Sequence, residues 1–199
     1  MAALAMLNRG LARGLAAIIG LLGTMCFLTA GVIGLPFVIL GPMLVILVHE
    51  LGHAFTAQHL GMAVHAIAVG PFKVNFKPRR LGWSDQILGR DVGGSVVYDE
   101  TLGRFLSRRT HALIAAAGPA ANLVTGAAAY AVGRFIGDWT PGRMLVGFAL
   151  ASLAAFVLSA WPHKLRSGRA NDALEIVRDL WPNRTARTRK PKRTPWQAQ

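Results

Sequence analysis

The stretch that decides the fold is VILVHELGHAFTAQ, Val45 to Gln58, an apolar run that contains two histidines and a glutamate. Titratable side chains are costly in hydrocarbon, about 2.5–3.5 kcal/mol or more for an ionised group at the centre of a membrane helix. If the run spans a membrane, these three groups therefore need a purpose. The alternatives are a metal site within a membrane helix and a chance pattern outside the membrane.

The surrounding composition places the run in a membrane. The chain has 199 residues, of which 53% are hydrophobic and 16% charged, whereas a typical soluble domain has about 25% charged residues. No charged residue occurs between Leu15 and Val48, a run of 34 residues. At about 1.5 Å per residue this run is too long for one crossing of a ~30 Å hydrocarbon core. We expect a break at Gly34-Leu35-Pro36, because proline cannot continue the hydrogen bonding of a helix.

The sequence predicts an α-helical polytopic membrane protein. We expect four transmembrane helices, at Leu15–Gly34, Phe37–Gln58, Ala112–Val132 and Met144–Trp161. Arg9 and Arg13 before the first span resemble the start of a signal peptide, but the apolar run continues past any plausible cleavage site, so we expect the span to be retained. Residues 1–181 are expected to form one membrane-embedded domain, and residues 182–199 a basic, disordered cytoplasmic tail.

The distribution of lysine and arginine predicts the orientation of the spans. Three segments, 1–14, 59–111 and 162–199, hold 20 of the 22 basic residues, and residues 133–143 hold the other two. Basic segments stay on the cytoplasmic side, so both termini are expected in the cytoplasm, with the chain in the cell (inner or plasma) membrane. The basic tail fits anionic lipid or a topology signal better than nucleic acid, which is not an expected partner.

The segment between the second and third spans contains β-strand patterns. AVHAIAV ends at Gly70-Pro71, and FKVNFK (Phe72–Lys77) then alternates apolar with polar residues, which predicts a small β-hairpin. GGSVVYDE is a candidate third strand, which would make the hairpin a small sheet. Beyond the fourth span, Ala173–Trp181 predicts an amphipathic helix.

The histidines and the glutamate match a metal-site pattern. His49 and His53 are four residues apart, so on a helix their imidazoles share one face and can bind one zinc ion. Glu50 projects about 100° away from His49 and can reach a water on that ion without being a ligand. This is the H-E-x-x-H arrangement, in which the glutamate acts as general base. Gly52 leaves room for another helix to pack closely. His49 would lie ~12 Å from the cytoplasmic surface, so water must reach it from that side.

Three stretches of the sequence resemble the site-2 protease family of intramembrane zinc metalloproteases. They are HELGHAFTAQHLGM (49–62), AAAGPAANL (115–123) and SAWPHKLRSGRANDALEI (159–176), which occur in the family's order within roughly residues 35–180. The resemblance implies a core of three membrane helices, one Zn²⁺ held by two histidines and an aspartate, and cleavage of a substrate's own membrane helix. No PDZ-like or CBS-like insertion is recognisable, so the resemblance is to a compact form of the family.

A third zinc ligand is needed, because catalytic zinc usually has three protein ligands and a water. The resemblance implies Asp172, which follows Pro162 as in the family's Asn-x-x-Pro…Asp-Gly motif. Ser159 and Ala173 stand where the family has asparagine and glycine. The alternative role of Asp172, and of Asn171 before it, is to cap the following helix. Other candidate ligands are Asp85, Asp91, His111 and His163.

Gly118-Pro119 matches the family's Gly-Pro-x-x-Asn element. The functional interpretation is that Asn122 faces the metal cleft and binds substrate backbone or the developing oxyanion. An interhelical hydrogen bond in a kinked helix is the equally open alternative.

These features predict an intramembrane zinc endopeptidase, in which Glu50 is general base for a zinc-activated water. Its expected partners are a membrane-protein substrate and the lipid bilayer. The hairpin near residues 64–77 is expected to hold the unwound substrate as an added strand. The alternative is a catalytically silent zinc-binding membrane protein that acts as a binding or regulatory module. Glu50 is the only acid in the predicted spans, which argues against a zinc transporter, and its presence argues against a silent protein.

Overall fold

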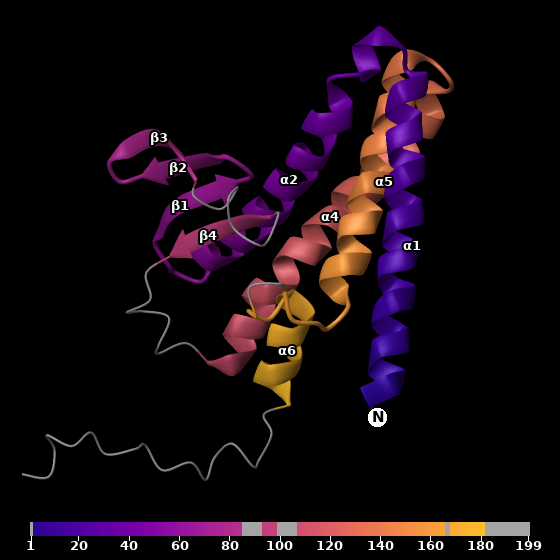
Figure 1. Ribbon diagram of the computed structural model, residues 1–199. Coiled ribbons are helices and arrows are strands. Elements are labelled where there is room, and N and C mark those ends of the chain that lie inside the picture. Colours follow the sequence, from indigo (N-terminus) through magenta and orange to yellow (C-terminus); the bar gives the residue numbers. More distant parts are fainter. Residues whose placement is uncertain (1, 85–92, 99–106, 166–167, 182–199) are drawn as a thin grey trace, which may run out of the picture.

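A computed structural model describes residues 2–84, 93–98, 107–165 and 168–181 of the chain (Figure 1). It contains helices that are long and apolar enough to cross a membrane, namely α1 (Ala2–Thr29), α2 (Phe37–His59), α4 (Arg108–Ile136) and α5 (Thr140–Ala160). A four-stranded antiparallel sheet occurs between α2 and α4 in the sequence. A short helix, α6 (Asp172–Leu180), follows α5. The prediction of a helical, multi-pass membrane protein with a small sheet is confirmed.

The boundaries of the spans differ from the predicted ones. The first helix ends at Thr29 rather than Gly34, because a 3-10 turn, η1 (Val32–Gly34), fills the connection to α2, whose N-cap is Pro36. Helix α5 begins at Thr140, four residues before the predicted start, with Pro141 in its first turn, where proline supports a helix start. Helix α4 extends four residues beyond its predicted span at each end.

Small residues allow the membrane helices to approach closely. The ring of Phe27 on α1 is 2% exposed and fills the space above two glycines, Gly41 of α2 and Gly147 of α5. A Cβ atom would lie 2.7 Å from this ring at Gly41 and 2.9 Å at Gly147. On α4, a Cβ atom at Gly126 would lie 3.0 Å from the Cβ of Ser152 on α5. Hydrophobicity does not drive helices together in lipid, so these close contacts hold the bundle.

The sheet consists of β1 (Val64–Val69), β2 (Phe72–Phe76), β3 (Arg79–Trp83) and β4 (Gly94–Tyr98), in the order β3-β2-β1-β4. The predicted hairpin is confirmed as β1–β2, and the predicted third strand is β4, which pairs with β1. Strand β3 was not predicted, because RRLGW contains no β-branched residue and only a weak alternation. Among the described residues, β3 and β4 are therefore the outer strands of the sheet.

An apolar cluster fixes the sheet to the helices. Its buried members come from the end of α2, from the connection to β1, from β1 and from α4: Ala54, Ala57, Met62, Val64, Ile67 and Ile114. Val96 and Tyr98 of β4 pack against this cluster. As a result, β4 lies beside the part of α2 that carries the H-E-x-x-H sequence.

The amphipathic helix predicted at Ala173–Trp181 is confirmed as α6, which packs mainly against α4 (Figure 1). Asn171 is its N-cap, as the sequence suggested. The predicted basic tail at 182–199 lies outside the described residues, as do Asp85 and Asp91.

Candidate metal centre

The side chains of His49, His53 and Asp172 meet between α2 and α6. Each offers one donor atom, and these atoms all lie within 4.8 Å of one another. Nε2 of His49 is 2.9 Å from Oδ2 of Asp172, and Nε2 of His53 is 3.6 Å from Oδ1. The two imidazoles stand edge to face, with ring centroids 4.8 Å apart. Two imidazole nitrogens and one carboxylate that converge in this way fit a zinc ion with one position left for water.

A backbone contact orients His53. Its Nδ1 lies 2.7 Å from the carbonyl oxygen of Ile114 on α4. A carbonyl can only accept, so Nδ1 carries the proton and donates it, and Nε2 keeps its lone pair for a metal. Metal-binding histidines usually have such a second hydrogen bond, which fixes both the ring and its tautomer.

Asn122 has the same relationship to His49. Its side-chain amide lies 3.2 Å from Nδ1 of His49, and the residue is fully buried. With Nδ2 toward the ring, the buried Oδ1 has no hydrogen-bond partner. Turning the amide by 180° places Oδ1 against the ring, where it accepts a proton from Nδ1 and leaves Nε2 of His49 free for the metal. In this orientation Asn122 sets the tautomer of His49 that zinc binding requires.

The direct substrate contact expected of Asn122 stays a prediction. The residue is fully buried and is not among the described residues that line the cavity beside His49. Its position fits the interhelical hydrogen bond that the sequence left open, since it links α4 to α2.

Two glycines allow α4 to lie against α2 at this point. A Cβ atom at Gly52 would lie 2.5 Å from the carbonyl oxygen of Ala117, which confirms the close packing predicted there. A Cβ atom at Gly118 would collide with Nε2 of His53 and lie 2.7 Å from Nε2 of His49. The missing side chain of Gly118 thus provides room for the Nε2 atoms of both histidines, a role that the sequence pattern alone did not reveal.

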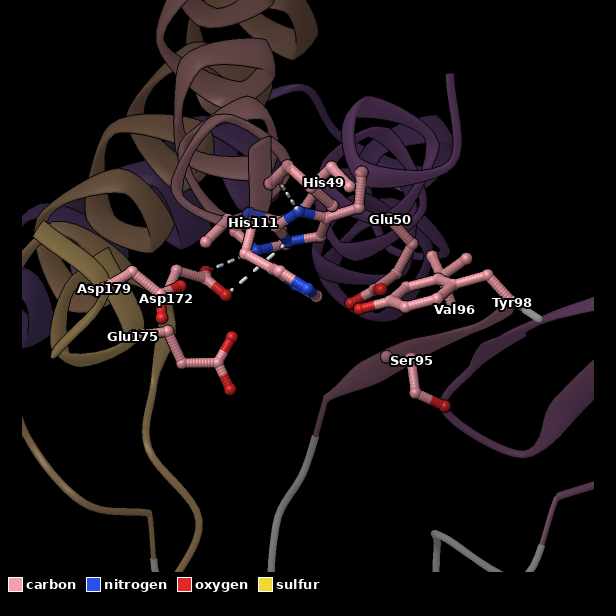
Figure 2. A pocket seen from close by; sticks show the side chains of 13 residues that line it. His49, Glu50, Ser95, Val96, Tyr98, His111, Asp172, Glu175 and Asp179 are labelled. Atoms are coloured by element: carbon pink, nitrogen blue, oxygen red, sulfur yellow. Dashed lines mark hydrogen bonds and ion pairs between the residues drawn. The ribbon is translucent and has the colours of Figure 1, made fainter. Parts of the chain in front are cut away.

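The three donor atoms line a cavity of about 180 Å³ (Figure 2). Helices α2, α4 and α6 and strand β4 all contribute to its wall. The sequence did not predict that β4, with Gly94 and Tyr98, would line the cavity, because this depends on how the sheet packs against α2. The local signal was the Gly93-Gly94 pair at the start of the strand.

Glu50 lines the same cavity and is 6% exposed (Figure 2). Strand β4 lies directly against it, because a Cβ atom at Gly94 would collide with Cγ of Glu50 and lie 2.5 Å from Oε1. The carboxylate therefore lies between α2 and β4, outside the group of three donor atoms. This is the arrangement expected of a base that is not a ligand.

Helix α6 presents three acids to the cavity: Asp172, Glu175 and Asp179 (Figure 2). Burial raises the pKa of Glu175, and the charges of Asp172 and Asp179 raise it further, whereas Arg178 and His111 lower it. Mutual repulsion of this kind favours a cation beside the helix.

Of the other candidate ligands, His111 and His163 belong to the described residues, and neither is in this group of three donors. His111 lines the cavity, but within the described part of the chain the group of three convergent donors consists of His49, His53 and Asp172. Nδ1 of His163 lies 2.8 Å from the carbonyl oxygen of Trp161.

Comparison with known families agrees with this geometry. Residues 37–186 match peptidase family M50, the site-2 protease family. The chain belongs to this family. The matched part of the chain contains α2, the sheet, α4, α5 and α6, and with them the three convergent donors and Glu50. The resemblance seen in the sequence is thereby confirmed. No curated protein and no solved structure matches the chain.

Proposed function

We propose that this M50 peptidase is an intramembrane zinc endopeptidase that hydrolyses a peptide bond in or near a transmembrane segment of a membrane protein. The observation that carries the proposal is a single cavity that contains both the three convergent donor atoms and the carboxylate of Glu50. Membership of a metallopeptidase family supports it. The alternative of a silent zinc-binding protein gains no specific support from the site, because Glu50, the proposed base, lines the same cavity as the three donors.

His49, His53 and Asp172 would hold one zinc ion per chain. Bound there, zinc would supply Lewis acidity, which polarises a scissile carbonyl and activates a water. The hydrogen bonds from α4 hold the two imidazoles with Nε2 inward, so the ligand set is arranged before the metal arrives.

Glu50 would move the protons. It would accept a proton from the attacking water and deliver it to the nitrogen of the leaving amine. Its carboxylate is almost completely buried, so it is held in one place and shielded from bulk water. Gly94 allows the backbone of β4 to approach it, which would bring a substrate bound along β4 close to the base.

The substrate is proposed to bind along β4. A helical substrate hides its peptide bonds, so the segment to be cut must be unwound and held in extended form. The expectation that the hairpin at residues 64–77 holds this segment is wrong, since β1 and β2 each pair on both sides. Strand β4 is the outer strand beside β1 in the described sheet and lines the cavity, and an extended segment bound along it would lie beside Glu50.

The proposed orientation puts both termini on the cytoplasmic side of the cell membrane. It follows from the basic residues, 20 of which lie in segments that four spans place on one side. The metal site would then open toward the cytoplasm, from which water reaches it.

Cleavage of a membrane-embedded substrate tests the proposal. Candidate substrates are found by comparing the membrane proteins of cells that carry the wild-type chain with those of cells that carry Glu50→Gln. Proteins that accumulate only with the variant are then used as substrates. Purified wild-type protein should cleave such a substrate within or beside its membrane helix, whereas Glu50→Gln should retain zinc and lose cleavage. Wild-type cleavage rates in the variant would exclude Glu50 as the base. A zinc-loaded wild-type chain that cleaves none of these proteins would favour the silent alternative.

A further inference from the structure

The side chain of Asn171 joins the end of α5 to the start of α6. It is 7% exposed, and its Nδ2 lies 3.3, 3.0 and 2.7 Å from the carbonyl oxygens of Leu158, Ser159 and Trp161. Its Oδ1 accepts hydrogen bonds from the backbone N–H groups of His163 (2.9 Å) and Leu174 (3.2 Å). Two N–H groups thus serve three carbonyls, and one oxygen serves two donors.

These contacts satisfy backbone groups that have no partner within their own helices. The last carbonyls of a helix and the first N–H groups of the next one need partners from outside. Helix α5 ends at Ala160 and Pro162 follows two residues later, which removes one backbone donor that could otherwise fold back. Asn171 supplies donors to the end of α5 and an acceptor to the start of α6.

The loop between the two helices is held by its own backbone. Lys164 and Ala170 form an antiparallel bridge, and the N–H of Leu165 donates to the carbonyl of Arg169 at 2.8 Å. The N–H of Asn171 donates to the carbonyl of His163 at 3.1 Å. The loop therefore returns the chain to the end of α5, where Asn171 is fastened.

Asp172 is the next residue, the first of α6, and its carboxylate faces His49 and His53. Helix α6 has nine residues, too few to be stable without external anchors. We propose that Asn171 is a positioning residue, which sets the metal affinity of the site by fixing Asp172 relative to α5. This inference rests on the proposed function, because it requires Asp172 to be a zinc ligand.

Two substitutions separate this role from simple helix capping. Asn171→Ser keeps a hydroxyl that can cap α6 but is too short to reach the carbonyls of α5, whereas Asn171→Ala loses both contacts. Ser107→Ala is the matched control, since Ser107 caps α4 by accepting from the N–H of Thr110 and takes no part in the metal site. The measurements are zinc affinity by competition with a chelator, and the visible absorption of the cobalt-loaded protein, which reports the ligand geometry.

Both Asn171 variants should bind zinc about 10- to 100-fold more weakly, with a changed cobalt spectrum, since residues that orient a ligand typically have effects of this size. Ser107→Ala should bind zinc as the wild type does. On an Asp172→Asn background, Asn171→Ala should cause no further loss, because its effect passes through Asp172.

Wild-type zinc affinity in Asn171→Ser would overturn the positioning role, as would equal losses from Asn171→Ala with and without Asp172. In either case zinc binding by the wild type would leave the proposed function intact. A wild-type chain that binds no zinc would instead contradict the proposed function and, with it, the role of Asn171.

Discussion

Oδ2 of Asp172 lies 2.9 Å from Nε2 of His49, although 123 residues separate the two in the chain. Helix α4 contacts the Nδ1 atoms of His49 and His53, on the side of each ring opposite Nε2. The inner nitrogens therefore face the carboxylate that α6 supplies. The candidate metal centre thus depends on three helices, although only α2 carries the H-E-x-x-H sequence.

Substitution Gly118→Ala should disrupt the metal centre. The added methyl group would occupy the space of the two Nε2 atoms, so we expect at least a tenfold loss of zinc affinity, as measured by chelator competition. Gly20→Ala on α1 is the control and should keep its zinc, because a Cβ atom there would make an ordinary contact, 3.9 Å from the Cβ of Ala154. Equal zinc affinity in the two variants would contradict the close approach of α4 to the histidines.

Substitution Gly94→Ala should impair cleavage while zinc binding persists. Its methyl group would displace the carboxylate of Glu50, and a misplaced general base typically costs a factor of about 10²–10⁴ in rate. Gly93→Ala provides a matched control, because nothing lies within 4 Å of a Cβ atom there. Rates and zinc content measured on both variants decide the matter. If they cleave equally fast, β4 does not adjoin the base as described.

Asn122 should support zinc binding through His49. Asn122→Leu removes the acceptor for Nδ1–H and should lower zinc affinity about 10- to 100-fold, whereas Asn122→Asp retains an oxygen at that position and should lose less. Chelator competition on both variants measures the difference. If the two bind zinc as tightly as the wild type while cleavage falls, Asn122 acts on the substrate instead.

Glu175 should make the stability of the metal-free protein depend on pH. Its pKa is raised on folding, so the folded state binds protons more tightly than the unfolded state. Stability therefore falls as pH rises from the pKa of an ordinary glutamate, about 4.3, through the raised value. Glu175→Gln removes this penalty and should raise the Tm of the metal-free protein at about pH 8, but not below about pH 4. A Tm shift that is equal at both pH values would show that the charge of Glu175 is not its cause.

Much of the fold could be predicted from local patterns. The uncharged runs predicted four spans, and the pairing of β1 with β2 followed from alternation around Gly70-Pro71. Helix boundaries were less accurate, since a 3-10 turn can occupy the residues before Pro36. Strand β3 was missed because it is formed by pairing with β2 and has little pattern of its own.

The candidate site also has residues that a local pattern predicts and residues whose roles depend on the folded chain. The convergence of His49 and His53 was predictable, because a spacing of four residues puts both side chains on one helix face. No local pattern links Asp172 to them, so it could be named only through the family resemblance. The roles of Gly94 and Gly118 depend on the space between packed elements, which a sequence does not display. Asn171 was foreseen as a cap, but its contacts with α5 required the folded loop.

The zinc content of purified chains, measured together with cleavage of the same substrate, tests the central claim most directly. The wild type and Glu50→Gln should each contain one zinc per chain, and only the wild type should cleave. Asp172→Asn should lose both zinc affinity and cleavage, because one of three protein ligands is weakened. An Asp172→Asn chain that binds zinc and cleaves as the wild type does would contradict the account of this metal centre.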